Sequence, residues 1–247
     1  MFKVTMSDSK LLKSSVDAIS NLIDEAGISV DEEGLKLRAM DPAHVALVDF
    51  QLSKEAFDNF EVTEPVVLGV DLERLNTILK RAGPGEMIIM DLDEDKNMLR
   101  IKIKNTSTRT FSLPLIDVAD EELKVPSLDF PSSVEVLPSV LKEAIKDAEI
   151  VSDHVTLKTD ENSLHISAKG DLGNVGVKIL KDDAIEFLSG GEVGSMFSLE
   201  YLSDMMKASD LADTVKINLG NDIPVRLDFK AENVHLLFLL APRIESE

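Results

Sequence analysis

The chain repeats one pattern of helices and strands in its two halves, and this duplication limits the possible folds more than any single motif. Leu12 and Lys13 coincide with Leu141 and Lys142 at an offset of 129 positions, from 12 to 141. Further matches follow at offsets of 129 and then 127: Leu35 with Leu164, Leu37 with Ile166, Ala39 with Ala168, Leu72 with Leu199, Leu75 with Leu202, and Lys80 with Lys207. A repeated unit of about 120 residues with two helices and several strands is typical of a duplicated α+β domain.

The stretch between the two copies, Leu115 to Asp129, has neither a helical nor a strand period. It nevertheless contains Leu123 and Val125, and solvated connectors usually lack large apolar side chains. We therefore interpret it as a linker that also serves as a docking site. The expected parts are a first domain, a connecting segment and a second domain, at residues 1–116, 117–129 and 130–247.

Two helices are expected in the first half. Apolar residues recur on one face of a 3.6-residue period from Ser9 to Ala26. Asp71 is a suitable cap for a second helix that ends at Ala82, before Gly83-Pro84-Gly85. The strands predicted from alternation and turn residues are Phe2–Met6, Ile28–Val30, Leu35–Met40, Val45–Leu52, Val66–Val70, Met87–Leu92, Met98–Lys104 and Thr108–Leu115.

The second half repeats this order. Pro138 opens a third helix, and Ser198 is placed to cap a fourth. The residues expected to face inward from these helices are Leu141, Ala144, Ile145, Ala148, Leu199, Leu202, Met205 and Met206. The predicted strands are Val155–Thr159, Leu164–Lys169, Val175–Leu180, Val215–Leu219, Val225–Lys230 and Val234–Leu240.

Composition limits the class of protein. The 247 residues include no Cys, which excludes a disulfide framework and a thiolate nucleophile. No apolar run approaches the roughly 18 to 20 residues that span a bilayer, and the N-terminus lacks a signal-peptide pattern. We therefore expect a soluble intracellular protein without a membrane partner.

Charge gives two readings. The 26 basic and 46 acidic residues give a net charge of −20, which by itself argues against nucleic acid. Yet lysines occupy equivalent positions on all four predicted helices: Lys13, Lys80, Lys142 and Lys207. Three further basic residues lie near them: Lys10, Arg81 and Lys146. Lysine is a good helix former on any solvated face. The alternative is that the helices together form one basic surface.

Motifs for catalysis and metal binding are incomplete. Asp91-x-Asp93-x-Asp95 begins like a calcium loop, but Lys96 and Lys102 replace the required Gly and Glu, so a hairpin turn is expected. The four His have no metal spacing, and no phosphate loop or nucleophile elbow is present. We expect neither an enzyme nor a cofactor.

Several long motifs occur in the order found in one family. They are IDEAGISVDEEGLKLRAMDPAHVALVDF (23–50), GVDLERLNTILKRAG (69–83), RTFSLPLID (109–117), VSDHVTLKT (151–159), KGDLGN (169–174) and LLFLLAPRIE (236–245). The chain thus resembles the proliferating cell nuclear antigen family of DNA sliding clamps, and more closely its archaeal members. The resemblance implies a ring-forming fold of two duplicated clamp domains, each with two helices packed on antiparallel sheet.

The resemblance also implies a closed head-to-tail homotrimer around double-stranded DNA, held without sequence specificity. The helices would line the hole, so that six lysines face DNA: Lys10, Lys13, Lys80, Lys142, Lys146 and Lys207. Ser20, Thr77 and Glu200 stand where eukaryotic clamps carry Lys or Arg. Topology should therefore matter more than direct DNA contact.

The subunit interface implied by the resemblance pairs the strand at Thr108–Leu115 with Leu172–Leu180 of the next subunit. The matching residues are Arg81, Arg109, Phe111, Glu143, Asp147, Val177 and Ile179. Surface ion pairs among them would each contribute roughly 0 to 1 kcal/mol.

Client enzymes of this family insert a short hydrophobic and aromatic motif beneath the connecting segment. The positions that carry over are Met40, His44, Val45, Leu47, Leu123, Val125, Pro126, Pro224, Leu239, Leu240, Ala241, Pro242, Arg243 and Ile244. Leu239 replaces a Tyr of the eukaryotic clamps. From the residues alone, His44 reads as a turn residue and Leu239-Leu240 as core.

The function implied by the resemblance is that of a non-enzymatic DNA polymerase sliding clamp, which confers processivity in DNA replication and repair. Expected partners are DNA polymerase, the clamp loader, flap endonuclease and DNA ligase, in the cytoplasm at the nucleoid, or in the nucleus of a eukaryote. Two alternatives stay open: a subunit of a heteromeric clamp, and a small-molecule hydrolase that uses the acidic clusters on a duplicated α+β scaffold.

Overall fold

The computed structural model describes residues 2–118, 123–171 and 173–243. The chain forms two compact units, each assembled from several segments. The first consists of Met1–Pro42, Val48–Lys124 and Glu232–Leu236, and the second of Ala43–Leu47, Val125–Ala231 and Leu237–Glu247. Ile244 and Leu172, which were assigned to the client site and the subunit interface, lie outside the described residues.

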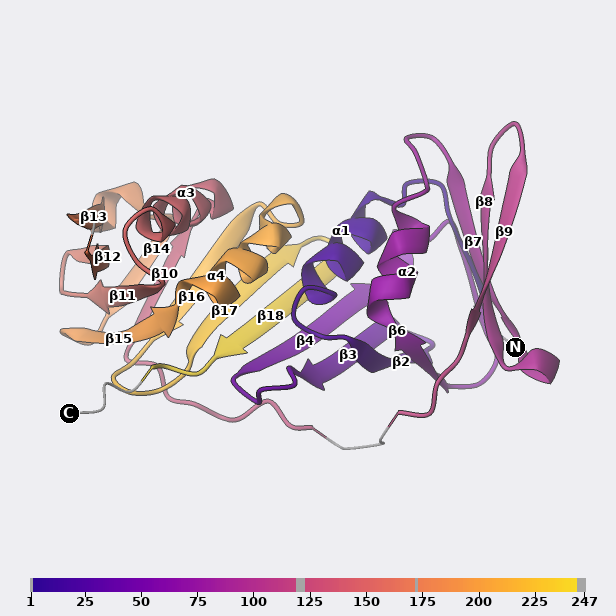
Figure 1. The fold of residues 1–247 in the computed structure, drawn as a ribbon, viewed down its shortest axis with the longest axis horizontal. Helices are drawn as coiled ribbons and strands as arrows, with labels where there is room; N and C mark the ends of the chain where they lie inside the picture. Colours follow the sequence, from indigo (N-terminus) through magenta and orange to yellow (C-terminus); the bar gives the residue numbers. More distant parts are fainter. Residues whose placement is uncertain (1, 119–122, 172, 244–247) are drawn as a thin grey trace. The chain divides into compact units, whose positions relative to one another are not determined.

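The first unit contains two antiparallel sheets and two helices (Figure 1). One sheet has the order β5–β1–β7–β8–β9, with β1 (Phe2–Met6), β5 (Asn59–Val62), β7 (Met87–Asp93), β8 (Met98–Lys104) and β9 (Thr108–Pro114). The remaining strands of this unit follow one another in the order β4–β3–β2–β6, with β2 (Glu25–Asp31), β3 (Gly34–Met40), β4 (Ala46–Ser53, in this unit from Val48 onward) and β6 (Val66–Asp71). The helices are α1 (Lys10–Ile19) and α2 (Leu72–Leu79).

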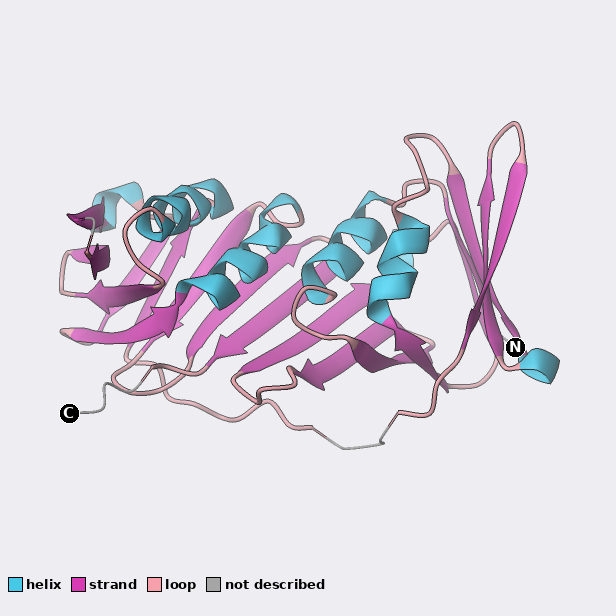
Figure 2. Cartoon of the chain, in the orientation of Figure 1, coloured by secondary structure: helices cyan, strands magenta, loops and turns pink. Residues whose placement is uncertain are grey.

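The core of the first unit lies where both helices meet both sheets. Leu12 and Val16 of α1 and Leu72 and Leu75 of α2 are buried against apolar side chains from β1, β2, β3, β6, β7 and β8. Figure 2 shows α1 and α2 on the same face of the β4–β3–β2–β6 sheet. Asp71 caps α2 as predicted, because its carboxylate accepts a 2.8 Å hydrogen bond from the backbone nitrogen of Arg74.

The second unit repeats this arrangement. Five of its strands follow one another in the order β14–β10–β16–β17–β18, with β10 (Ser132–Val136), β14 (Glu186–Ser189), β16 (Thr214–Leu219), β17 (Val225–Ala231) and β18 (Val234–Leu240, in this unit from Leu237 onward). A separate sheet has the order β13–β12–β11–β15, with β11 (His154–Thr159), β12 (Ser163–Gly170), β13 (Gly173–Leu180) and β15 (Val193–Ser198). The helices are α3 (Pro138–Glu149) and α4 (Leu199–Met205), and α4 continues into a 3₁₀ turn, η4 (Met206–Asp210).

The internal duplication is confirmed by this correspondence of elements. Leu12 in α1 and Leu141 in α3 are both buried, and Leu72 and Leu199 are the first residues of α2 and α4. All eight residues predicted to face inward from α3, α4 and the following turn are buried: Leu141, Ala144, Ile145, Ala148, Leu199, Leu202, Met205 and Met206. The fold class is therefore duplicated α+β, as predicted.

The first helix is shorter than predicted. It ends at Ile19 instead of Ala26, and β2 begins at Glu25. Ile23 and Ala26 are buried, as the helical period required, but Ala26 is paired with Val70 of β6. Asn21 and Asp24 disfavour a helix interior, and pairing with β6 decides the conformation from Glu25 onward.

Four strands were not predicted: β5, β10, β14 and β15. They have only four to six residues each, and β5 and β14 lie at sheet edges and contain no fully buried residue, so their apolar signal is short and weak. The second helix also ends earlier than expected, at Leu79 instead of Ala82.

The Asp91–Asp95 motif lies on β7 and the turn after it. Glu94–Lys96 forms a 3₁₀ turn, and Asn97 has a left-handed φ of 51°. The Asp91 carboxylate accepts hydrogen bonds from Arg100 and Lys102, which compensate its charge. Within the described residues no group of His, Cys, Asp and Glu could hold a metal ion. Among residues 2–118, 123–171 and 173–243, no helix is long and apolar enough to cross a membrane.

Candidate interaction surfaces

Lys13 of α1 and Lys80, the residue that follows α2, each contact a polar group of the other helical segment. The Lys80 ammonium is 2.5 Å from the Asp17 carboxylate, which also accepts a 2.9 Å hydrogen bond from Asn76. Lys13 donates from its ammonium to the carbonyl of Ala82, and Lys10 is exposed. Acids and carbonyls on the same surface therefore offset part of the positive charge that the sequence predicts for these helices.

The second unit shows the same compensation. Lys146 pairs with Glu143 one turn earlier on α3, at 2.8 Å. Lys207 lies on η4, beyond the end of α4, and pairs with Asp204 at 2.8 Å. Such exposed pairs contribute little and are screened by salt, so these lysines can exchange a carboxylate for a phosphate at small cost. The six lysines remain a prediction for DNA contact.

Each unit ends one of its sheets with a strand that pairs on one side only. Among the described strands, β9 follows β8 at the end of its sheet, and β13 follows β12 at the end of another. Phe111 on β9 and Val177 on β13 are half-buried, whereas Ile179 is buried. Unpaired backbone N–H and C=O groups on such strands are a template for pairing with another chain.

Arg109 on β9 is held within its own chain. Its guanidinium donates to the Glu86 carboxylate at 2.5 Å and to the carbonyl of Arg81 at 3.2 Å. The Glu86 carboxylate also accepts a 2.8 Å bond from the backbone nitrogen of Gly83. This backbone bond first, and Arg109 second, lower the pKa of Glu86 below its ordinary value.

The other predicted interface charges, Glu143 and Asp147, are exposed on α3. The sequence analysis did not identify Glu86. Its one signal was the turn Gly83-Pro84-Gly85 directly before it.

The connecting segment begins with backbone bonds to the first unit. Leu115 donates to the carbonyl of Asn97 at 3.1 Å, and Ile116 donates to the carbonyl of Gly69 at 3.0 Å. Further along, the carbonyl of Leu123 accepts a 2.9 Å hydrogen bond from the Arg38 guanidinium. Within this unit, Met40 is half-buried at the end of β3. Arg38 was absent from the predicted site residues.

The client positions of the second unit divide by exposure. Ala241 donates a 2.8 Å hydrogen bond to the carbonyl of Val45, which brings these two segments side by side. His44 is an exposed turn residue with a left-handed φ of 59°. Accessible side chains, exposed or partly exposed, belong to His44, Val45, Val125, Pro126, Pro224, Ala241, Pro242 and Arg243. Leu47, Leu239 and Leu240 are buried, so their contribution to a pocket is mainly to its wall.

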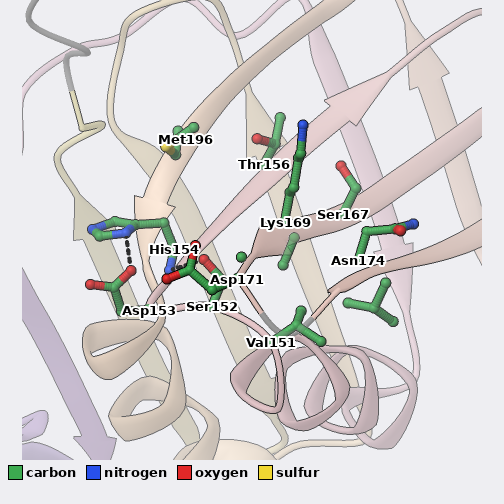
Figure 3. A pocket seen from close by; sticks show the side chains of 13 residues that line it. Val151, Ser152, Asp153, His154, Thr156, Ser167, Lys169, Asp171, Asn174 and Met196 are labelled. Atoms are coloured by element: carbon green, nitrogen blue, oxygen red, sulfur yellow. Dashed lines mark hydrogen bonds and ion pairs between the residues drawn. The ribbon is translucent and has the colours of Figure 1, made fainter.

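Figure 3 shows a hollow of 690 Å³ on the second unit, beside His154. The Asp153 carboxylate lies 2.5 Å from Nδ1 of His154, and Lys169 and Asn174 line another part of the wall. Asn174 belongs to β13, and Thr156, Ser167 and Met196 from the other three strands of this sheet complete the lining.

Ser163, His165 and Asp160 also meet, at the turn between β11 and β12. Both the Ser163 hydroxyl and the Asp160 carboxylate lie 2.9 Å from Nε2 of His165. A catalytic triad places the serine and the acid on opposite ring nitrogens, so this cluster does not have triad geometry. The backbone nitrogen of Asn162 first, and His165 second, lower the pKa of Asp160. The cluster stabilises the turn.

Comparison with known proteins covers the whole chain. The family model for the proliferating cell nuclear antigen N-terminal domain matches residues 1–123, and the model for its C-terminal domain matches residues 124–244. The DNA polymerase sliding clamp of Methanococcus maripaludis strain C5 is 42% identical over 252 residues, with 100% of both chains covered. That of Pyrococcus furiosus is 39% identical over 247 residues, with 99% of both covered.

Solved structures of proliferating cell nuclear antigens have the same fold as this chain. The crystal structure of a proliferating cell nuclear antigen from Thermococcus kodakaraensis matches with a TM-score of 0.91 at 28% identity, covering 98% of this chain and 100% of the other. The duplicated fold with two helices and two sheets in each unit is thus that of DNA sliding clamps. The chain belongs to the proliferating cell nuclear antigen family. It is a DNA polymerase sliding clamp, a non-enzymatic processivity factor of DNA replication.

Proposed function

We propose that three copies of this chain close head to tail into a ring that encircles duplex DNA. The observation that carries this proposal is that β9 in the first unit and β13 in the second each lie at the end of a sheet and pair with a neighbour on one side only. Because the two edges differ, pairing β9 of one copy with β13 of the next is a heterologous contact, which forms a ring when the rotation closes. Phe111 and Val177 lie on these edges.

The ring holds DNA by topology, and the six helix lysines contact phosphates without sequence preference. Loading of the clamp onto nicked circular duplex tests this proposal. The bound clamp should stay on the closed circle after gel filtration and leave once a single restriction cut linearises it. Equal retention on circular and linear DNA would contradict encirclement.

The homotrimer is distinguished from a heteromeric clamp by mass. Light scattering should give three times 27.1 kDa, about 81 kDa, for the purified chain alone. A stable 27.1 kDa monomer that assembles only with related chains would favour the heteromeric alternative. The hydrolase alternative loses its support, because Arg100 and Lys102 already compensate Asp91.

The clamp tethers DNA polymerase, and by the same surface flap endonuclease, DNA ligase and the clamp loader, through a short hydrophobic and aromatic motif. The sliding-clamp relatives named above are described as DNA polymerase clamps, which supports the first of these partners. The cytoplasm, at the nucleoid, is the proposed location. The positions that the family resemblance assigns to the client motif are Leu123 and Val125 of the connecting segment and the accessible residues near Val45 and Ala241.

The double variant Leu123→Ala with Val125→Ala tests this site. It should abolish stimulation of a polymerase on primed circular DNA, because the apolar contacts of the motif are lost, and it should leave the mass of about 81 kDa unchanged. Normal stimulation by the double variant would reduce the segment to a linker.

A further inference from the structure

One side chain of the first unit fixes the connecting segment by a bond to its backbone. Arg38 on β3 faces Asp49 on β4, with 3.2 Å from Nε to Oδ1 and 3.1 Å from Nη2 to Oδ2. The remaining terminal nitrogen, Nη1, donates to the carbonyl of Leu123 at 2.9 Å. One guanidinium therefore bridges a sheet residue and a residue 85 positions away in the chain.

The geometry of the guanidinium makes this bridge directional. Its donors lie in one plane in a fixed fork, so two bonds to the same carboxylate set the orientation of the third donor. The Asp49 side chain is 12% exposed, whereas that of Arg38 is 38% exposed. The carboxylate is thus the fixed partner, and the arginine projects from it toward the segment.

The bond reaches the main chain of Leu123, so it sets the path of the segment independently of the side chain at that position. A segment held in place loses less conformational entropy when a ligand binds against it. The adjacent Leu123 and Val125 side chains are those assigned to client binding.

We propose that Arg38, oriented by Asp49, is a positioning residue that holds the connecting segment at Leu123 in the conformation to which client motifs bind. This inference rests on the proposed client site. Neither Arg38 nor Asp49 needs to touch the client; the pair acts through the Leu123 carbonyl.

Two conservative substitutions break the bridge at different points. Arg38→Lys keeps the charge and removes the fork, and Asp49→Asn keeps the shape and removes the carboxylate. Arg100→Lys is the matched control, because Arg100 pairs with Asp91 in the same unit at nearly equal exposure, 39% and 10%. Circular dichroism and light scattering verify that each variant folds and assembles.

The first measurement is trypsin cleavage after the exposed Lys124 in the free clamp. The second is the dissociation constant of a fluorescent peptide that carries a hydrophobic and aromatic motif, measured by anisotropy. Both bridge variants should speed cleavage after Lys124. They should also raise the dissociation constant of the peptide by roughly 3- to 10-fold, as expected for the loss of one hydrogen bond. The double variant should bind the peptide as tightly as either single variant, since both substitutions remove the same bond. Arg100→Lys should match the wild type.

The outcomes separate this inference from the proposed function. If the wild type binds the peptide and both bridge variants behave like it in cleavage and affinity, the role of Arg38 is overturned. If the wild type itself does not bind the peptide, the client site is overturned, and the positioning role falls with it. Additive losses in the double variant would also contradict a single shared bridge.

Discussion

Arg109, a predicted interface residue, is bound within its own chain. The resemblance assigned it to the neighbouring subunit, and the structure shows it bound to Glu86 and to the carbonyl of Arg81 in its own chain. Glu86 leaves part of the guanidinium accessible, since the Arg109 side chain is 33% exposed. The intrachain contact orients Arg109 on β9 before any partner arrives. Sequence patterns could not predict it, because the two residues are 23 positions apart, with β7 and β8 between them.

Glu86 should make stability depend on pH. Its pKa is lowered in the folded chain, chiefly by the Gly83 backbone nitrogen and then by Arg109, so its stabilising effect is fully present above the ordinary value of 4.5 and is lost as the pH falls through the lowered value. Urea unfolding of wild type and Glu86→Gln at a series of pH values measures this. The difference in unfolding free energy should be largest near pH 7 and shrink below pH 4.5. A difference that is constant with pH would contradict the assignment.

At the scale of elements, the sequence predicted best where apolar period and turn residues agree. The predicted bounds of β8 and β18 match the structure, and α3 has the apolar face expected from Pro138 onward. The predicted end of α1 was wrong. Ile23 and Ala26 satisfy a helical period and are buried, but Ile23 lies between α1 and β2, and Ala26 lies in β2. The four short strands and the bridge from Arg38 to Leu123 depend on contacts between distant segments, which a local pattern does not contain.

Strand β6 and the start of the connecting segment approach too closely for a side chain. A Cβ placed on Gly69 would collide with the carbonyl oxygen of Ile116. The backbone nitrogen of Ile116 donates a hydrogen bond to the Gly69 carbonyl, which holds the two segments at this distance. Gly69→Ala should therefore lower the unfolding free energy by about 1–3 kcal/mol through backbone displacement. Gly83→Ala is the control, because its Cβ would meet only Glu86, at an ordinary 3.6 Å. Urea titration gives both values, and equal effects would argue against the close approach as the cause.

Strand β13 should control assembly through its edge. Val177→Lys places a charge at this half-buried position. Natural edge strands carry such charges, and these prevent pairing with another chain. Light scattering of the variant should show loss of the species of about 81 kDa in favour of 27.1 kDa at micromolar concentration. Val67→Lys, on the exposed edge of β6, is the control and should keep the trimer. An intact Val177→Lys trimer would exclude β13 as the subunit contact.

At the scale of the whole molecule, a net charge of −20 is compatible with a DNA-encircling function because charge and topology act at different steps. Repulsion from the acidic surface is screened beyond about 8 to 10 Å at physiological salt. Lys80, Lys146 and Lys207 are partly compensated by Asp17, Glu143 and Asp204, so each proposed contact with phosphate would be weak. Weak contacts permit sliding, and a closed ring does not need strong ones to stay on DNA.

This separation predicts different effects on loading and on retention. Lys10 on α1 and Lys142 on α3 lie on the helices assigned to the hole, and Lys10→Glu with Lys142→Glu reverses two charges there. Electrostatic attraction raises association rates, so loading onto nicked circular DNA by the loader with ATP should slow several-fold, more at low salt than at high salt. The half-life on the closed circle should stay unchanged, because leaving requires the ring to open. Lys36→Glu on β3 with Lys54→Glu in the 3₁₀ turn Lys54–Ala56 reverses the same number of charges outside α1 to α4, and is the control for net charge alone. A retention half-life on closed circles that falls in step with the loading rate would mean that electrostatic affinity, and not encirclement, keeps this clamp on DNA.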